Sequence, residues 1–338
     1  MDINYFHINN RRYFGNKHRL RNFISQTLKN EKINLTSFVD IFAGTGAVSD
    51  LVNNSCEKII LNDILKSNEI ILKTFFEINF PYEKEIIDKI KFLNSIETTD
   101  ENYFSQNFGG TYFTKSNARK IGLIREEIDN ISESEFQKNI LLTSLIYAVD
   151  KIANTAGHYD SFFRRILDSD LEIKLLLPKI NWELNLDNSV YNMDANLLIK
   201  DIHCDVLYLD PPYNSRQYSD AYHVLENLVE WEKPDVFGLA KKMDRSHIKS
   251  KYNSKDATLS FKELIEAANC NHILLSYNST KDTKNHRSNA RINDKDIIEI
   301  LENKGKVKVY ETEYRAFTAG KSSSKGNKER LFYCRVSE

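Results

Sequence analysis

The 338-residue sequence has little cysteine and proline, no long apolar run and almost no net charge. Its four cysteines are widely scattered, and none forms a Cys-x-x-Cys pair. This spacing indicates neither a zinc site nor a disulfide framework, so we expect no metal and a reduced, cytoplasmic protein. The cysteines are Cys56, Cys204, Cys270 and Cys334.

No apolar stretch approaches the roughly 18 to 20 residues that a membrane-spanning helix needs. The N-terminal residues also lack a basic segment followed by an apolar one, so we expect neither a secretion signal nor a membrane partner. The composition, 41% hydrophobic and 28% charged, is that of an ordinary globular protein.

The net charge of −1 argues weakly against a nucleic-acid partner, but the charges are unevenly distributed. Basic residues cluster in segments 11–21, 241–255, 281–291 and 315–335, whereas acidic residues concentrate in 83–135. The pattern is compatible with one basic face. Lysine-rich loops that are merely solvated would give the same pattern.

Alternating segments at both ends of the chain predict a parallel α/β sheet. Segment 37–42 reads as a strand, 43–48 as a glycine turn that opens a helix, and 58–62 as a second strand before a helix over 65–76. Further strands are expected at 189–192, 206–209 and 272–277. Segments 307–310 and 330–333 predict an antiparallel terminal hairpin, with a long polar tip at 319–327.

Residues 80–185 interrupt this pattern with a mostly helical stretch, in which 138–152 is a strongly periodic helix. The insertion is too long for an ordinary strand-to-helix connection. We therefore predict a discontinuous catalytic domain, 1–79 and 186–338, and an inserted helical subdomain, 80–185.

The loop Asp40–Gly46 carries the first chemical signal. Its glycines allow a ligand to approach the backbone closely, but the preceding carboxylate, Asp40, would repel a pyrophosphate and attract a cationic group. Asp63 follows Gly46 by 17 residues, about where a carboxylate binds ribose hydroxyls. The loop therefore predicts a cofactor with an ammonium group and a ribose but no phosphates, and S-adenosylmethionine is such a cofactor. A generic strand-to-helix turn is the alternative.

The second signal is Asp210-Pro211-Pro212-Tyr213, directly after the apolar run 204–209. Two prolines cannot continue a strand, so the strand stops and leaves a carboxylate and an aromatic ring at its end. Ligands of open α/β sheets bind at this edge. A rigid turn without chemistry is the alternative.

Taken together, these motifs resemble the Dam-like adenine-N6 DNA methyltransferases of restriction–modification systems. The opener 12–17 is similar to the family's N-terminal cofactor motif, and 191–194 is similar to the segment beside the cofactor's adenine ring. The resemblance implies a Rossmann-like S-adenosylmethionine-dependent fold, with target recognition by the insertion. Its implied cofactor residues are Tyr13, Gly15, Lys17, Asp40, Phe42, Ala43, Gly44, Gly46, Asp63, Asp194 and Asp210.

The implied catalytic residues are Asp210, Pro211, Pro212 and Tyr213. The exocyclic amine of adenine is a poor nucleophile, so a carboxylate and a backbone carbonyl would each accept one N–H and aim the lone pair at the methyl group. Tyr213 would stack on the flipped base. We expect Asp210 to act as a hydrogen-bond acceptor rather than as a general base with a raised pKa.

A cytosine carbon-5 methyltransferase needs a cysteine nucleophile, usually in a Pro-Cys pair. None of the five prolines precedes a cysteine, so this class is excluded. Cytosine-N4 and RNA adenine-N6 methylation stay open, as does a non-enzymatic nucleic-acid binder. Double-stranded DNA is the expected partner of a monomer, with a separately acting cognate endonuclease. The candidate DNA contacts are Arg216, Gln217, Tyr218, Lys281, Arg287, Lys321 and Lys325, for which solvated loop structure is the alternative.

Overall fold

The computed structural model describes residues 4–79, 84–164, 171–278, 290–313 and 328–337. The contacts divide the chain into two compact units. The helical unit comprises Met1–Asn16, Leu65–Leu186 and Tyr218–Ile248, and the sheet unit comprises Lys17–Ile64, Asp187–Gln217 and Lys249–Glu338. Among the described residues, none of the helices is both long and apolar enough to cross a bilayer.

The sheet unit is built on seven strands in the order β5-β3-β2-β6-β7-β9-β8. Five neighbouring strands are parallel, and β9 runs antiparallel to both β7 and β8. The predicted α/β fold with a terminal antiparallel hairpin is thus confirmed. The strands are β2 Ser37–Asp40, β3 Lys58–Asn62, β5 Ser189–Tyr191, β6 His203–Leu209, β7 Asn269–Asn278, β8 Gly305–Glu313 and β9 Lys328–Val336.

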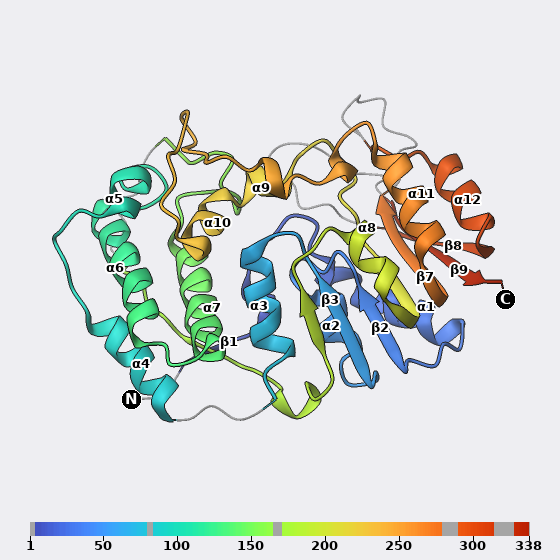
Figure 1. Cartoon of the computed structure of the whole chain (residues 1–338), viewed down its shortest axis with the longest axis horizontal. Coiled ribbons are helices and arrows are strands. Elements are labelled where there is room, and N and C mark those ends of the chain that lie inside the picture. Colours follow the sequence, from blue (N-terminus) through green and yellow to red (C-terminus); the bar gives the residue numbers. More distant parts are fainter. Residues whose placement is uncertain (1–3, 80–83, 165–170, 279–289, 314–327, 338) are drawn as a thin grey trace. The chain divides into compact units, whose positions relative to one another are not determined.

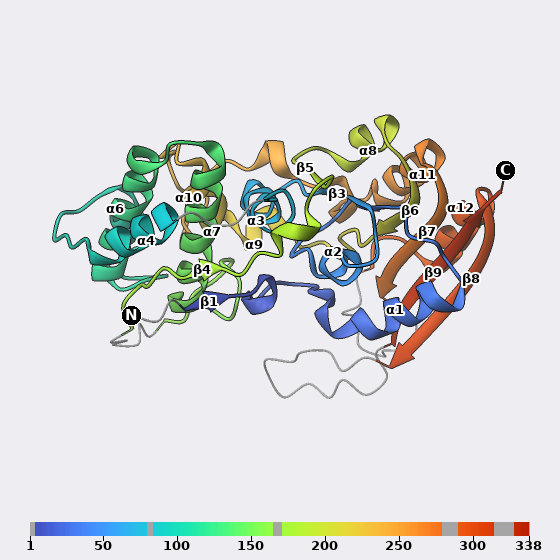
Figure 2. The same ribbon diagram turned by 90° about the horizontal axis from the view of Figure 1, so that it is seen from below.

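The central strands read as apolar runs because helices cover both of their faces. On one face, β2, β6 and β7 share a buried core with α8, α11 and α12, and α1 and α2 lie on the other (Figures 1 and 2). These helices are α1 Arg21–Asn30, α2 Ala47–Val52, α8 Ala195–Leu198, α11 Ala257–Ala267 and α12 Asp294–Glu302. The expected hairpin tip, 319–327, lies outside the described residues.

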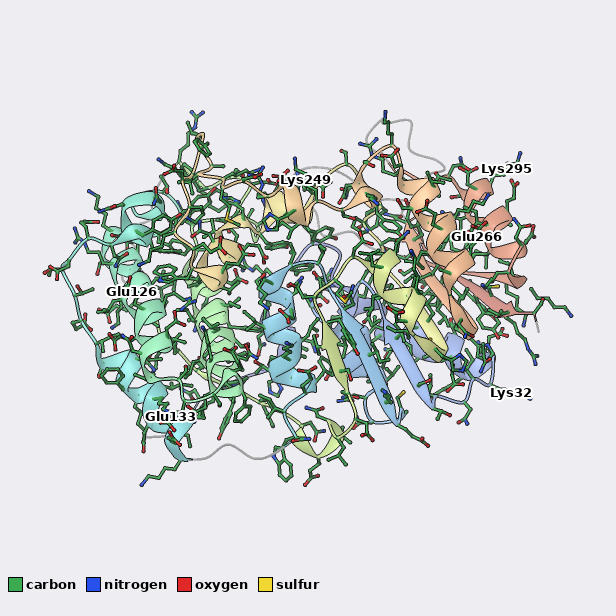
Figure 3. The ribbon with its side chains drawn as sticks, viewed as in Figure 1. Lys32, Glu126, Glu133, Lys249, Glu266 and Lys295 are labelled. Carbon is green, nitrogen blue, oxygen red and sulfur yellow. The ribbon has the colours of Figure 1, made fainter. Side chains whose placement is uncertain are left out.

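The outer surface of the sheet unit carries charges of both signs. Lys32, Glu266 and Lys295 all project outward from it (Figure 3). This mixture is what a solvated surface requires, and it defines no partner by itself.

The helical unit packs α3 against α7 and α10, and α6 against α5 and α7. Its helices are α3 Lys66–Phe76, α4 Lys84–Ser95, α5 Tyr103–Phe108, α6 Lys115–Ile131, α7 Glu135–Ile152, α9 Tyr218–Ala221 and α10 His223–Glu230. A short parallel pair, β1 Tyr5–Phe6 and β4 Leu177–Pro178, completes it. The periodic helix expected at 138–152 is confirmed by α7.

Within the insertion, the α-helices of the described residues end at Ile152. In the described residues 153–164 and 171–188 the chain forms no α-helix, only β4 and a 3-10 turn at Trp182–Leu184. Apolar residues such as Ile173, Leu175 and Leu177 are buried there. These apolar residues are therefore spaced by the packing of an irregular segment and not by the period of a helix.

Segment 218–248 joins the helical unit through buried polar contacts. Glu226 accepts hydrogen bonds from the N–H groups of Lys66 and Ser67 at the start of α3, at 2.8 and 3.0 Å. The buried guanidinium of Arg125 on α6 donates to the carbonyls of Leu228 and Val229, which end α10. Each contact satisfies groups that a helix end leaves unpaired.

Candidate active site

The site forms where the strand order reverses. From β2 the chain adds β3 and β5 on one side, and from β6 it adds β7 on the other. Residues Asp40 and Tyr208 are register partners of β2 and β6, so Asp210 follows just beyond. In an open parallel sheet the carboxyl ends of the strands leave a crevice at such a switch point. Both predicted signals, Asp40–Gly46 and Asp210–Tyr213, therefore come from the two strands that flank it.

The glycine loop holds one buried carboxylate with an unused oxygen. Asp40 is 1% exposed, and Ser49 Oγ donates to its Oδ2 at 2.8 Å. Its Oδ1 has no hydrogen-bond partner among the described residues. Gly44 and Gly46 adopt positive φ angles of 52° and 70°, which other residues adopt only with strain. The loop thus presents a carboxylate oxygen suited to an additional donor.

Asp63 supports this loop from the neighbouring strand. Its Oδ2 accepts a hydrogen bond from the Gly44 N–H at 2.9 Å, and the Ala43 N–H donates to the Asn62 carbonyl at the same distance. The ring of Phe42 meets Tyr252 edge to face. Asp194 caps α8 by accepting from the Asn196 N–H at 2.8 Å.

Asn62, a buried asparagine that was not predicted from the sequence, ties three segments of this edge together. Its Nδ2 donates to the carbonyls of Ile41 and Met193 at 3.1 and 3.0 Å, and the Met193 N–H donates to its Oδ1 at 3.0 Å. An asparagine at the end of an otherwise apolar strand was the available signal, because a buried amide needs partners.

At the second strand end, Lys17 reaches the Asp210–Tyr213 turn. Its ammonium lies 3.2 Å from Asp210 Oδ1, 3.7 Å from Glu329 Oε2 and 5.7 Å from the centre of the Tyr213 ring. Burial disfavours the charge of Lys17, but the two carboxylates outweigh burial and raise its pKa. The predicted residues Lys17, Asp210 and Tyr213 are therefore brought together, and Glu329 joins them unpredicted.

Both acidic strand ends have raised pKa values. Burial is the main cause: it raises the pKa of Asp40 to about 7, against the hydrogen bond from Ser49, and that of Asp210 to about 6, against the charge of Lys17. The expectation that Asp210 has no raised pKa was therefore wrong. Sequence alone did not reveal that the packed fold leaves only 17% of the Asp210 side chain exposed.

Tyr13 and Gly15, also predicted to bind cofactor, belong to the helical unit. The Tyr13 ring stacks on Tyr222 with centres 4.5 Å apart, and Asn68 Nδ2 donates to its hydroxyl at 2.9 Å. Gly15 has φ of 71°, and a side chain there would approach the Tyr218 hydroxyl to 3.0 Å. Their cofactor role stays a prediction.

The predicted DNA contacts fall into three groups. Arg216 is exposed, whereas both ends of the Gln217 amide are engaged by the Ser250 backbone, at 3.0 and 2.9 Å. Tyr218 stacks on Tyr13. The remaining four, Lys281, Arg287, Lys321 and Lys325, lie outside the described residues.

A second unpredicted residue, Asn253, shapes the loop after the motif. Its Nδ2 donates to the carbonyls of Asn214 and Arg216, at 2.7 and 2.9 Å. No sequence pattern marks this residue, since the contact joins segments 37 or more residues apart.

The fold and this site define the class, an α/β methyltransferase. The family profile of D12 class N6 adenine-specific DNA methyltransferases matches residues 13–289, most of the chain. The chain therefore belongs to this family.

Two curated relatives agree. The chain is 30% identical to modification methylase LlaI of Lactococcus lactis subsp. lactis, over 95% of this chain and 53% of that protein. It is 31% identical to type II methyltransferase M.NlaIII of Neisseria lactamica, over 94% of this chain and 95% of the relative. The chain thus spans about half of the first relative and nearly all of the second.

Among solved structures, the methyltransferase domain of bacterial CtHen1-C overlaps 95% of this chain and 99% of its own, with 10% identity and a TM-score of 0.32. The family assignment rests on the sequence matches.

Proposed function

We propose that this protein transfers a methyl group from S-adenosylmethionine to N6 of an adenine flipped out of duplex DNA, as the modification enzyme of a restriction–modification system. The observation that carries the proposal is the placement of the Asp40–Gly46 loop and the Asp210–Tyr213 turn on two adjacent parallel strands at one switch point.

The residues present fit this cofactor. Asp40 offers an unused buried oxygen to the ammonium of a methionine moiety, and Asp63 lies at the end of the next strand, where ribose hydroxyls would bind. Carboxylates outnumber the one buried ammonium, Lys17, among the described residues that form the site, which favours a cationic ligand. When bound, the sulfonium supplies an activated methyl group.

The chain's own residues would prepare the amine. Asp210 and the Pro211 carbonyl each accept one N–H of the target amine, which directs its lone pair toward the methyl group. Lys17 favours the ionised form of Asp210, so the carboxylate accepts rather than donates. Tyr213 stacks on the extruded base and offsets part of the few kcal/mol that base flipping costs.

Recognition of the DNA sequence is assigned to the inserted residues 80–185, and phosphate contacts to the loops that hold Arg216, Gln217 and Tyr218 and to the segments around 281–287 and 321–325. A monomer in the cytoplasm would act on DNA independently of a cognate endonuclease. The relatives named above are modification enzymes, which supports this setting.

The test is nucleoside mass spectrometry after incubation of the purified protein with S-adenosylmethionine and duplex DNA. We expect N6-methyladenine from wild type, none from Asp210→Ala, and wild-type levels from the exposed control Asp201→Ala. Cofactor binding by Asp210→Ala should stay within a few fold of wild type. N6-methyladenine formed by Asp210→Ala would refute the catalytic role of Asp210. If wild type formed only N4-methylcytosine, or methylated only RNA, adenine in duplex DNA would be refuted as the substrate.

A further inference from the structure

A buried carboxylate outside the matched family segment contacts the site. Glu329 lies on β9, beyond residue 289, where the family profile ends. It is 5% exposed, and Lys17, at 3.7 Å, is the one ion-pair partner that the described residues give it. A buried charge without a partner is strongly destabilising, so Glu329 depends on this ammonium.

Lys17 is shared between two acids rather than committed to one. Charge-assisted N–H···O⁻ hydrogen bonds measure about 2.7–2.9 Å. The ammonium is 3.2 Å from Asp210 and 3.7 Å from Glu329, longer than this range in both cases. Asp210 therefore keeps acceptor capacity that a short, exclusive ion pair with Lys17 would consume.

We propose that Glu329 is a positioning residue that draws Lys17 partly away from Asp210 and so leaves the Asp210 carboxylate free to accept the N–H of the target amine. The inference rests on the proposed methyl transfer and deepens it. Glu329 touches neither reactant and acts through Lys17.

The two partners influence Asp210 in opposite directions. Burial raises the pKa of Asp210, Lys17 lowers it, and Glu329 raises it. Removing the charge of Glu329 should therefore lower the pKa of Asp210, and removing that of Lys17 should raise it. Among the described residues, the ionisable groups that interact with the Asp210–Lys17 pair include Asp40, Tyr208, Tyr213 and Glu329.

The experiment measures single-turnover methylation of duplex DNA from pH 5 to 9 by full-length protein saturated with S-adenosylmethionine. For Glu329→Gln we expect a plateau rate about tenfold lower, equivalent to one partly lost hydrogen bond in the transition state. Its acid limb should move to lower pH, and that of Lys17→Met to higher pH. Exposed Glu302→Gln on α12 is the matched control and should match wild type.

The double variant Lys17→Met/Glu329→Gln separates positioning from folding. It removes both charges of the Lys17–Glu329 pair, and so avoids the buried, unpaired Glu329 carboxylate that Lys17→Met alone leaves. In the Lys17→Met background no ammonium is shared between Asp210 and Glu329. Adding Glu329→Gln there should change the plateau rate by less than about twofold. Equal effects in both backgrounds, or an unmoved acid limb, would overturn the role of Glu329. A wild-type protein without methylation would instead refute the proposed function.

Discussion

Replacing Asp40 by asparagine should stabilise the cofactor-free protein while impairing it as an enzyme. Burial, against the hydrogen bond from Ser49, raises the pKa of Asp40 from 3.8 to about 7. Since each pKa unit corresponds to about 1.4 kcal/mol, keeping this carboxylate charged at pH 8 costs the folded state about 4 kcal/mol. Asparagine removes the charge and still accepts from Ser49.

The new amide N–H groups take the place of Oδ1, which has no partner among the described residues. Leaving a buried donor unpaired costs about 1–3 kcal/mol, so the net gain is about 1–3 kcal/mol. In a chain of this size that gain corresponds to a rise of roughly 1–4 °C in melting temperature.

The pH dependence gives the sign of the effect. Because the folded-state pKa of Asp40 is raised, the wild type loses stability as pH increases from about 4 to about 7. Asp40→Asn should therefore melt higher than wild type at pH 8, and this gain should disappear at pH 4. It should also bind S-adenosylmethionine about tenfold or more weakly, because a charge-assisted hydrogen bond is lost. Differential scanning calorimetry and isothermal titration measure both. A variant that melts no higher at pH 8, or gains equally at pH 4, would refute the reasoning.

Three further results are expected. Asn62→Ala removes hydrogen bonds to Ile41 and Met193 and should lower the free energy of unfolding, measured with urea, by about 2 kcal/mol or more. An unchanged urea midpoint would show that these hydrogen bonds do not stabilise the fold. Asn253→Ala should slow methylation by loosening the loop at 214–216, with cofactor affinity unchanged in titration; an unchanged rate would remove Asn253 from the site. Exchanging residues 80–185 for those of a relative should change the methylated sequence, read by sequencing; an unchanged sequence would refute their recognition role.

Local patterns were sufficient to predict the sheet and the two strand ends that carry Asp40 and Asp210. Apolar runs that end in glycine or in two prolines mark where a strand stops, and parallel strands place such ends at one edge. Asp40 and Asp210 were located by this logic, and the register between β2 and β6 confirms that they lie at the ends of adjacent strands.

The supporting residues were not predictable, because their partners are set by strand order rather than by sequence spacing. Glu329 reaches Lys17 only because β9 inserts between β7 and β8. Gln217 carried a plausible DNA-contact pattern, yet the Ser250 backbone engages its amide. Raised pKa values likewise depend on burial that only the packed fold defines.

The most direct test of the central claim is methylation-aware sequencing of DNA from a methylation-free bacterial host that expresses this protein. We predict N6-methyladenine at one short recurring sequence, and its loss with Asp210→Ala. Genomic DNA without methylated adenine, despite soluble wild-type protein that binds S-adenosylmethionine, would contradict that claim.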